Sequence, residues 1–109
     1  MRILFDHGTP APLRAFLSGH TVLDAKARGW DTFKNGDLLT AAEDEGFDLL
    51  VTTDKNMRYQ QNLTGRSIAI VVLGNAQWRP VLQLHVVHVV AAVNAATPGS
   101  FIEIDIPVD

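Results

Sequence analysis

Two aspartates stand where carboxylates can do chemistry. Asp6 ends a short apolar run that begins at Arg2, and Asp54 directly follows the run over residues 48–53. Both runs are typical of buried strands, and open α/β sheets bind their ligands at the carboxyl ends of their strands. Carboxylates at such an edge need a partner, because burying an unpaired charge is costly. Mg²⁺ or Mn²⁺ is the natural one, since hard cations prefer oxygen ligands.

A third carboxylate, Asp37, stands near the start of a predicted helix and could point over the same edge. Three carboxylates around one ion leave positions for water and a phosphate, which metal-assisted cleavage of a phosphodiester needs. Each acid also has a structural interpretation. An aspartate after a strand commonly forms a turn or a cap, and an acid in the first turn of a helix is favoured by the helix dipole. Spacing alone leaves both interpretations open.

Polar residues beside these acids are candidates for substrate contacts. Lys55 and Arg58 could hold backbone phosphates, and Tyr59 could stack on a base. His7, next to Asp6, could bind a metal, move a proton or contact phosphate. A histidine in a turn, and a solvated polar loop after residue 54, are the plainer interpretations.

Two other pairs of residues have weaker claims to function. His85 and His88 are three residues apart on a predicted helix, so their imidazoles could share a metal. Their neighbours are valines, which favours packed or surface histidines instead. Trp30 and Trp78 are expected in packing or in an interface rather than in an active site.

The elements that must position these residues alternate along the chain. Thr9 and Asn35 are expected to cap two helices, and Leu13, Phe16 and Leu17 give the first helix an apolar face. Strands are predicted over residues 2–6, 20–23, 48–53, 67–73 and 101–106, and a third helix over 78–96. The strands at 2–6, 48–53 and 67–73 are expected to be central. This pattern predicts one α/β domain over residues 1–109, with a mostly parallel open sheet between two layers of helices.

Composition limits the kinds of partner. The chain has 109 residues, 47% of them apolar, and a net charge of -3, so no global basic field attracts nucleic acid and any such binding must use a local patch. It has no cysteine, which excludes disulfides and thiolate metal sites and fits a reducing cytoplasm. Polar residues interrupt the apolar stretch at 81–96, so no membrane span is expected.

Three motifs give the chain a family resemblance. The motifs are Phe5-Asp6-His7-Gly8-Thr9-Pro10, Asn35-Gly36-Asp37-Leu38-Leu39 and Val51-Thr52-Thr53-Asp54-Lys55-Asn56. Through them the chain resembles small stand-alone PIN-like proteins of bacteria, relatives of the toxins of VapC type, over nearly its whole length. Residues 56–63 are similar to one branch of that group. The resemblance implies a PIN-like, three-layer α/β/α fold in which Asp6, Asp37 and Asp54 match the metal-binding, catalytic acids.

The resemblance also implies an activity and partners. We expect a ribonuclease dependent on Mg²⁺ or Mn²⁺, with Lys55, Arg58, His7 and Asn56 near the RNA, a small antitoxin protein as a partner, and a homodimer. The wider group often has further acids where this chain has His7 and Asn56. Because each missing carboxylate lowers the negative charge around the ion, a PIN-like binding module without catalysis is the alternative.

A phosphorylation-dependent receiver domain is a third interpretation, with Asp54 as the phosphate acceptor. A receiver also needs a hydroxyl residue at the end of its fourth strand and a lysine at the end of its fifth. The chain has Leu73-Gly74-Asn75 and Ile106-Pro107 at those places. This interpretation therefore ranks below the nuclease.

Overall fold

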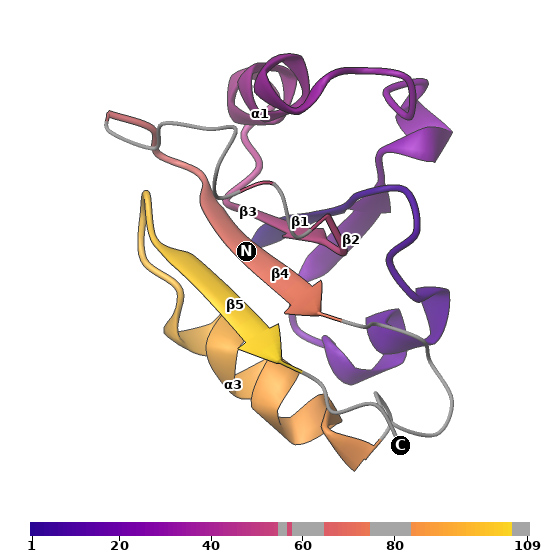
Figure 1. Ribbon diagram of the computed structural model, residues 1–109, viewed down its shortest axis with the longest axis vertical. Helices are drawn as coiled ribbons and strands as arrows, with labels where there is room; N and C mark the ends of the chain where they lie inside the picture. The colour runs from indigo at the N-terminus through magenta and orange to yellow at the C-terminus, as the bar shows by residue number, and fades with distance from the viewer. Residues whose placement is uncertain (55–56, 58–64, 75–83, 106–109) are drawn as a thin grey trace.

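A parallel sheet forms the centre of the computed structural model, which describes residues 1–54, 57, 65–74 and 84–105 (Figure 1). Within these ranges the sheet has five strands in the order β2-β1-β3-β4-β5, and every neighbouring pair is parallel. The strands are β1 (Arg2–Phe5), β2 (Thr21–Asp24), β3 (Leu49–Thr52), β4 (Ala69–Gly74) and β5 (Phe101–Asp105). The prediction of a parallel sheet with β1, β3 and β4 inside it is confirmed.

The inner strands are apolar throughout because both faces of the sheet are covered. Leu4 of β1 pairs with Leu50 of β3 and points to one face, whereas Ile3 and Phe5 point to the other. Every residue of β3 and β4 is buried. Such strands read as continuous apolar runs in the sequence, and for that reason the sequence predicts them well.

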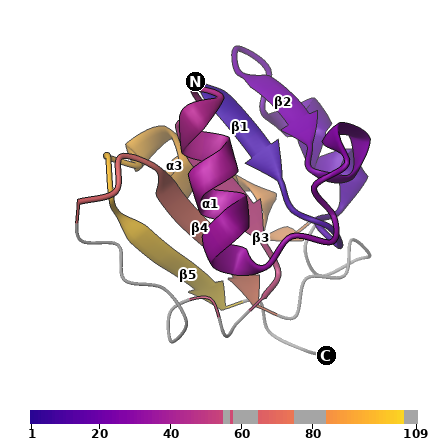
Figure 2. The ribbon, with the colours of Figure 1, turned by 90° about the horizontal axis from the view of Figure 1, so that it is seen from above.

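Helices cover the two faces and give the layers α/β/α. On one face α1 (Asn35–Asp44) buries Leu38, Leu39 and Ala42. On the other face lie the 3₁₀ helix η1 (Ala11–Phe16) and α3 (Val86–Ala95). Figure 2 shows α1 in front of the sheet and α3 behind it. No helix within the described ranges is long and apolar enough to cross a membrane.

The last crossover differs in hand from the first two. The connections through η1 and α1 move in opposite directions across the sheet and lie on opposite faces, as connections of one hand do. The chain crosses the sheet in the same direction from β4 to β5 as from β2 to β3, so a connection of the same hand would place α3 on the face that α1 covers. Instead α3 packs on the opposite face, where Val89 and Val93 share a core cluster with Leu13 of η1. The chain thus has the strand order of flavodoxin-like sheets without their uniform winding.

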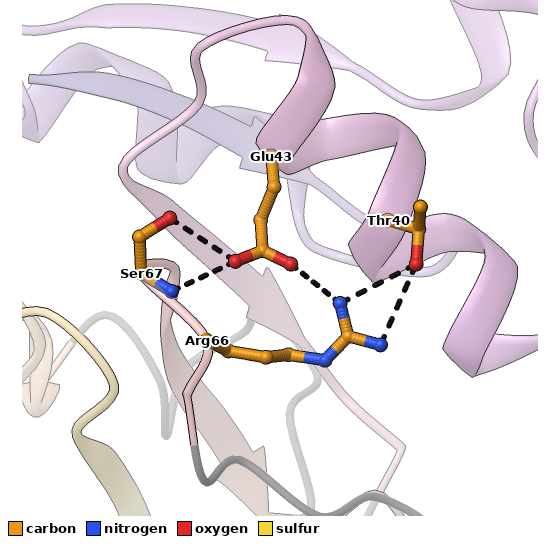
Figure 3. A network of polar contacts seen from close by, with 4 residues as sticks. All are labelled: Thr40, Glu43, Arg66 and Ser67. Atoms are coloured by element: carbon orange, nitrogen blue, oxygen red, sulfur yellow. Dashed lines mark hydrogen bonds and ion pairs between the residues drawn. The ribbon is translucent and has the colours of Figure 1, made fainter.

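A polar network fixes α1 to the segment that enters β4 (Figure 3). One carboxylate oxygen of Glu43 accepts hydrogen bonds from the backbone N–H of Ser67 at 2.7 Å and from its hydroxyl at 3.0 Å. The other oxygen pairs with Arg66, which also contacts Thr40. Burial raises the pKa of Glu43, but the hydrogen bonds from Ser67 and Arg66 outweigh it and hold that pKa below its ordinary value.

Two predictions about helix starts and one about a helix face were wrong. Thr9 does not cap η1, whose N-cap is Pro10, and the hydroxyl of Thr9 donates to the carbonyl of Val51 at 3.0 Å. Asn35 is the first residue of α1 rather than its cap, which is Lys34. Phe16 is 43% exposed, because the 3₁₀ winding of η1 buries Leu13 and, just beyond the helix, Leu17. The predicted start of the last helix at residue 78 lies outside the described residues.

Candidate functional site

The sheet brings Asp6 and Asp54 to one edge. The strand order reverses between β1 and β3, and open α/β sheets bind ligands at the carboxyl ends of the two strands that flank such a reversal. Asp6 directly follows β1, and Asp54 comes two residues after β3. The two acids therefore stand at the edge where open α/β sheets commonly bind ligands, which we call the carboxyl edge.

The hydroxyl of Thr52 links the two acids. It donates to Oδ2 of Asp6 at 2.7 Å and accepts from the backbone N–H of Asp54 at 3.1 Å. Thr52 is the one polar residue that is fully buried among those that the structure describes. Its single hydroxyl proton goes to a carboxylate, so Asp6 gains a strong, charge-assisted bond.

Backbone groups fix Asp6 further. Its own N–H donates to the carbonyl of Val51 at 2.9 Å, which continues the β1–β3 ladder by one residue. Oδ1 of the carboxylate accepts from the N–H of His7 at 2.8 Å. Each carboxylate oxygen thus has a hydrogen bond, and each keeps a second lone pair for another partner.

Asp54 is held from the helix side of the edge. Asn35, the first residue of α1, donates from Nδ2 to Oδ2 of Asp54 at 2.8 Å. The N-terminus of α1 therefore lies next to this carboxylate, where the helix dipole favours negative charge.

Asp37 lies two residues after Asn35 on α1, and its side chain is exposed. Residues two apart on a helix point to different sides, so the contact from Asn35 to Asp54 does not bring Asp37 with it. Across the described residues, no group of three acids or histidines is close enough together to hold a metal ion. The assignment of Asp37 as a third ligand stays a prediction.

A cavity of about 360 Å³ opens beside Asp6. His7, Thr9, Asp24 and Lys26 contribute to its walls, and we call it the Asp6 cleft. Asp24 is paired with Arg14 at 2.7 Å on the exposed rim. Sequence reasoning selected His7 but missed Lys26, whose signal is its place just past the end of β2, the neighbour of β1.

The remaining candidates are only partly described. Lys55, Asn56, Arg58 and Tyr59 lie outside the described residues, as does Trp78. The rings of His85 and His88 lie 5.8 Å apart at the start of α3.

Trp30 packs half-buried against the core cluster beneath α1, so its predicted packing role is confirmed.

Comparisons with protein-family models, with curated proteins and with solved structures found no match for this chain.

Proposed function

We propose that the chain is a ribonuclease of PIN-like type that depends on Mg²⁺ or Mn²⁺, and that it serves as the toxin of a toxin–antitoxin pair. One observation carries the nuclease proposal. The carboxylate of Asp6 and the backbone N–H of Asp54 both hydrogen-bond the hydroxyl of Thr52, at the carboxyl ends of the two strands that flank the reversal of strand order. A buried linker between two acids at a binding edge fits a site that must hold its carboxylates in register.

The donor atoms fit a hard divalent cation. Mg²⁺ is commonly held by one or two carboxylates and keeps several water ligands. Asp6 and Asp54 would hold the ion, with Asp37 as the proposed third ligand. When bound, the ion supplies an activated water and stabilises the charge that develops on the phosphate.

The residues of the chain divide the remaining work. Thr52 and Asn35 hold the two carboxylates in their orientations. His7 lines the Asp6 cleft and is assigned to proton transfer or to a phosphate contact there. Lys26, together with Lys55 and Arg58, is assigned to the phosphates of the RNA backbone.

The test is cleavage of mixed RNA with and without a chelator. Asp54→Asn keeps the shape of the side chain and removes its charge, so cleavage in Mg²⁺ or Mn²⁺ should fall by about a hundredfold or more. Asp44→Asn, at the exposed far end of α1, is the matched control and should cleave like the wild type. Cleavage that resists the chelator, or that survives in Asp54→Asn, contradicts the metal-dependent mechanism.

A PIN-like binding module without catalysis is the second candidate. Its support is the presence of His7 and Asn56 where the wider group has acids, together with the lack of a three-ligand cluster in the described part of the chain. Asn56→Asp restores one of these acids and should tighten metal binding. A wild type that does not cleave, beside an active Asn56→Asp variant, would decide for the module.

A further inference from the structure

Aromatic rings form a stack beside α1 that the proposed chemistry does not use. Trp30 and Phe33 are stacked, with ring centroids 6.1 Å apart and an interplanar angle of 19°. Trp30 also meets the buried ring of Phe47 edge-on at 6.2 Å. The core thus anchors the inner side of the stack, while Phe33 is 41% exposed at its outer end.

The segment that carries this stack also holds cations. The guanidinium of Arg28 lies 4.6 Å from the centroid of Trp30 and is paired with Glu45 at 3.0 Å. Lys26 and Lys34 are exposed, and neither forms an ion pair with any residue that the structure describes. Residues 26–34 hold three basic side chains against one acid, Asp31, in a chain whose net charge is -3. Because Arg28 is already paired with Glu45, Lys26 and Lys34 are the cations of this segment that can meet phosphates, a local positive charge of the kind that nucleic-acid binding by an acidic chain requires.

The same segment spans the carboxyl edge from one acid to the other. At its start, the N–H of Ala25 donates to the carbonyl of Phe5 at 2.9 Å, and Lys26 lines the Asp6 cleft. At its end, Lys34 caps α1, whose first residue, Asn35, contacts Asp54. The exposed ring of Phe33 thus lies next in the chain to the helix start that holds the second acid.

We propose that residues 26–34 form a platform that binds single-stranded RNA, with an unpaired base on Phe33 and backbone phosphates on Lys26 and Lys34. This inference rests on the proposed ribonuclease function and adds the place on the chain where the RNA strand binds. Base stacking on an exposed aromatic ring between lysines is the common way to bind single strands without sequence preference. A duplex hides the faces of its bases and cannot use such a ring.

The test measures binding by the full chain in the presence of a chelator, so that no cleavage takes place. The probe is a fluorescently labelled oligoribonucleotide of mixed sequence, about 12 nucleotides long, and the readout is fluorescence anisotropy. Phe33→Ala should weaken binding by about 5- to 100-fold, the usual effect of losing one stacked base. Lys34→Gln should also weaken binding. Because it removes one phosphate contact, the slope of the logarithm of the binding constant against the logarithm of the salt concentration should become less steep by about 0.7.

The matched control is Phe16→Ala. Phe16 is 43% exposed, close to the value for Phe33, but it lies on η1 at the opposite face of the sheet. This variant should bind the probe like the wild type. Equal affinities of Phe33→Ala and Phe16→Ala, equal binding of a duplex of the same sequence, or no binding by the wild type would overturn the platform.

The outcomes separate the platform from the nuclease. Binding that depends on Phe33, in a wild type that never cleaves RNA, supports the platform and refutes the nuclease. Cleavage that depends on Asp54, with an unchanged KM in Phe33→Ala, supports the nuclease and refutes the platform.

Discussion

Thr52→Val tests whether one buried hydroxyl holds the candidate site together. Valine has nearly the same shape and favours strands, so the packing of β3 should survive. The change removes the donor to the Asp6 carboxylate, which is worth about 1.5–3 kcal/mol for a hydrogen bond to a charged group. It also removes the acceptor of the Asp54 N–H, at a further cost of about 1 kcal/mol.

The expected loss in free energy of unfolding is therefore about 2–4 kcal/mol, since the strand preference of valine offsets only a few tenths. For a domain of this size the midpoint of thermal unfolding should fall by roughly 10 °C or more. Urea unfolding followed by circular dichroism gives the free energy directly.

Thr52→Ser keeps the hydroxyl and loses one buried methyl group, so it should cost only about 1 kcal/mol. The order of stability should thus be wild type, then serine, then valine. If the valine variant is within about 0.5 kcal/mol of the wild type in free energy of unfolding, or is more stable than the serine variant, the inference that the Thr52 hydroxyl links Asp6 to Asp54 is refuted. If the site binds a cation, Mn²⁺ affinity should follow the same order.

Two further predictions concern the helices. Glu43→Gln should destabilise the protein at pH 7, because the lowered pKa of Glu43 means that its charged form is favoured in the folded state. That contribution is present above the ordinary pKa of a glutamate in the unfolded chain and is lost as pH falls through the lower pKa of the folded state. Urea unfolding at a series of pH values should therefore show the difference in stability between the variant and the wild type shrinking at acid pH. Leu84, just before α3, and Val87, on α3, are 73% and 65% exposed, and we predict a homodimer across this surface. Val87→Asp should shift light scattering toward the monomer, whereas a wild type that stays monomeric at high concentration contradicts the dimer.

The sequence predicts the meeting of Asp6 and Asp54 because parallel strands share an edge at which their carboxyl ends lie together. It does not predict the role of Thr52, because that role depends on strand register. Phe5 pairs with Val51, so the next residues along, Asp6 and Thr52, fall opposite each other. Nothing in the local pattern of either strand states this register.

Contacts between distant segments decided the other differences. Asn35 has the propensity of a helix cap, but it is the first residue of α1, and its Nδ2 donates to the carboxylate of Asp54, which follows a distant strand. Thr9 likewise donates to a carbonyl of β3. The sequence also could not predict which face of the sheet α3 covers. Both faces are buried, and the apolar residues of α3 could pack against either one.

The pairing of β1 with β3 has a consequence for how the site comes into being during synthesis. Asp6 and Thr52 are 46 residues apart, and β1 lies between its two partners in the sheet. A nascent chain that has exposed only β1, η1 and β2 has one acid and no linker, so the carboxyl edge assembles when β3 inserts beside β1. A chain truncated before β3 therefore retains Asp6 but cannot hold it in place, and a fragment of that kind should be inert.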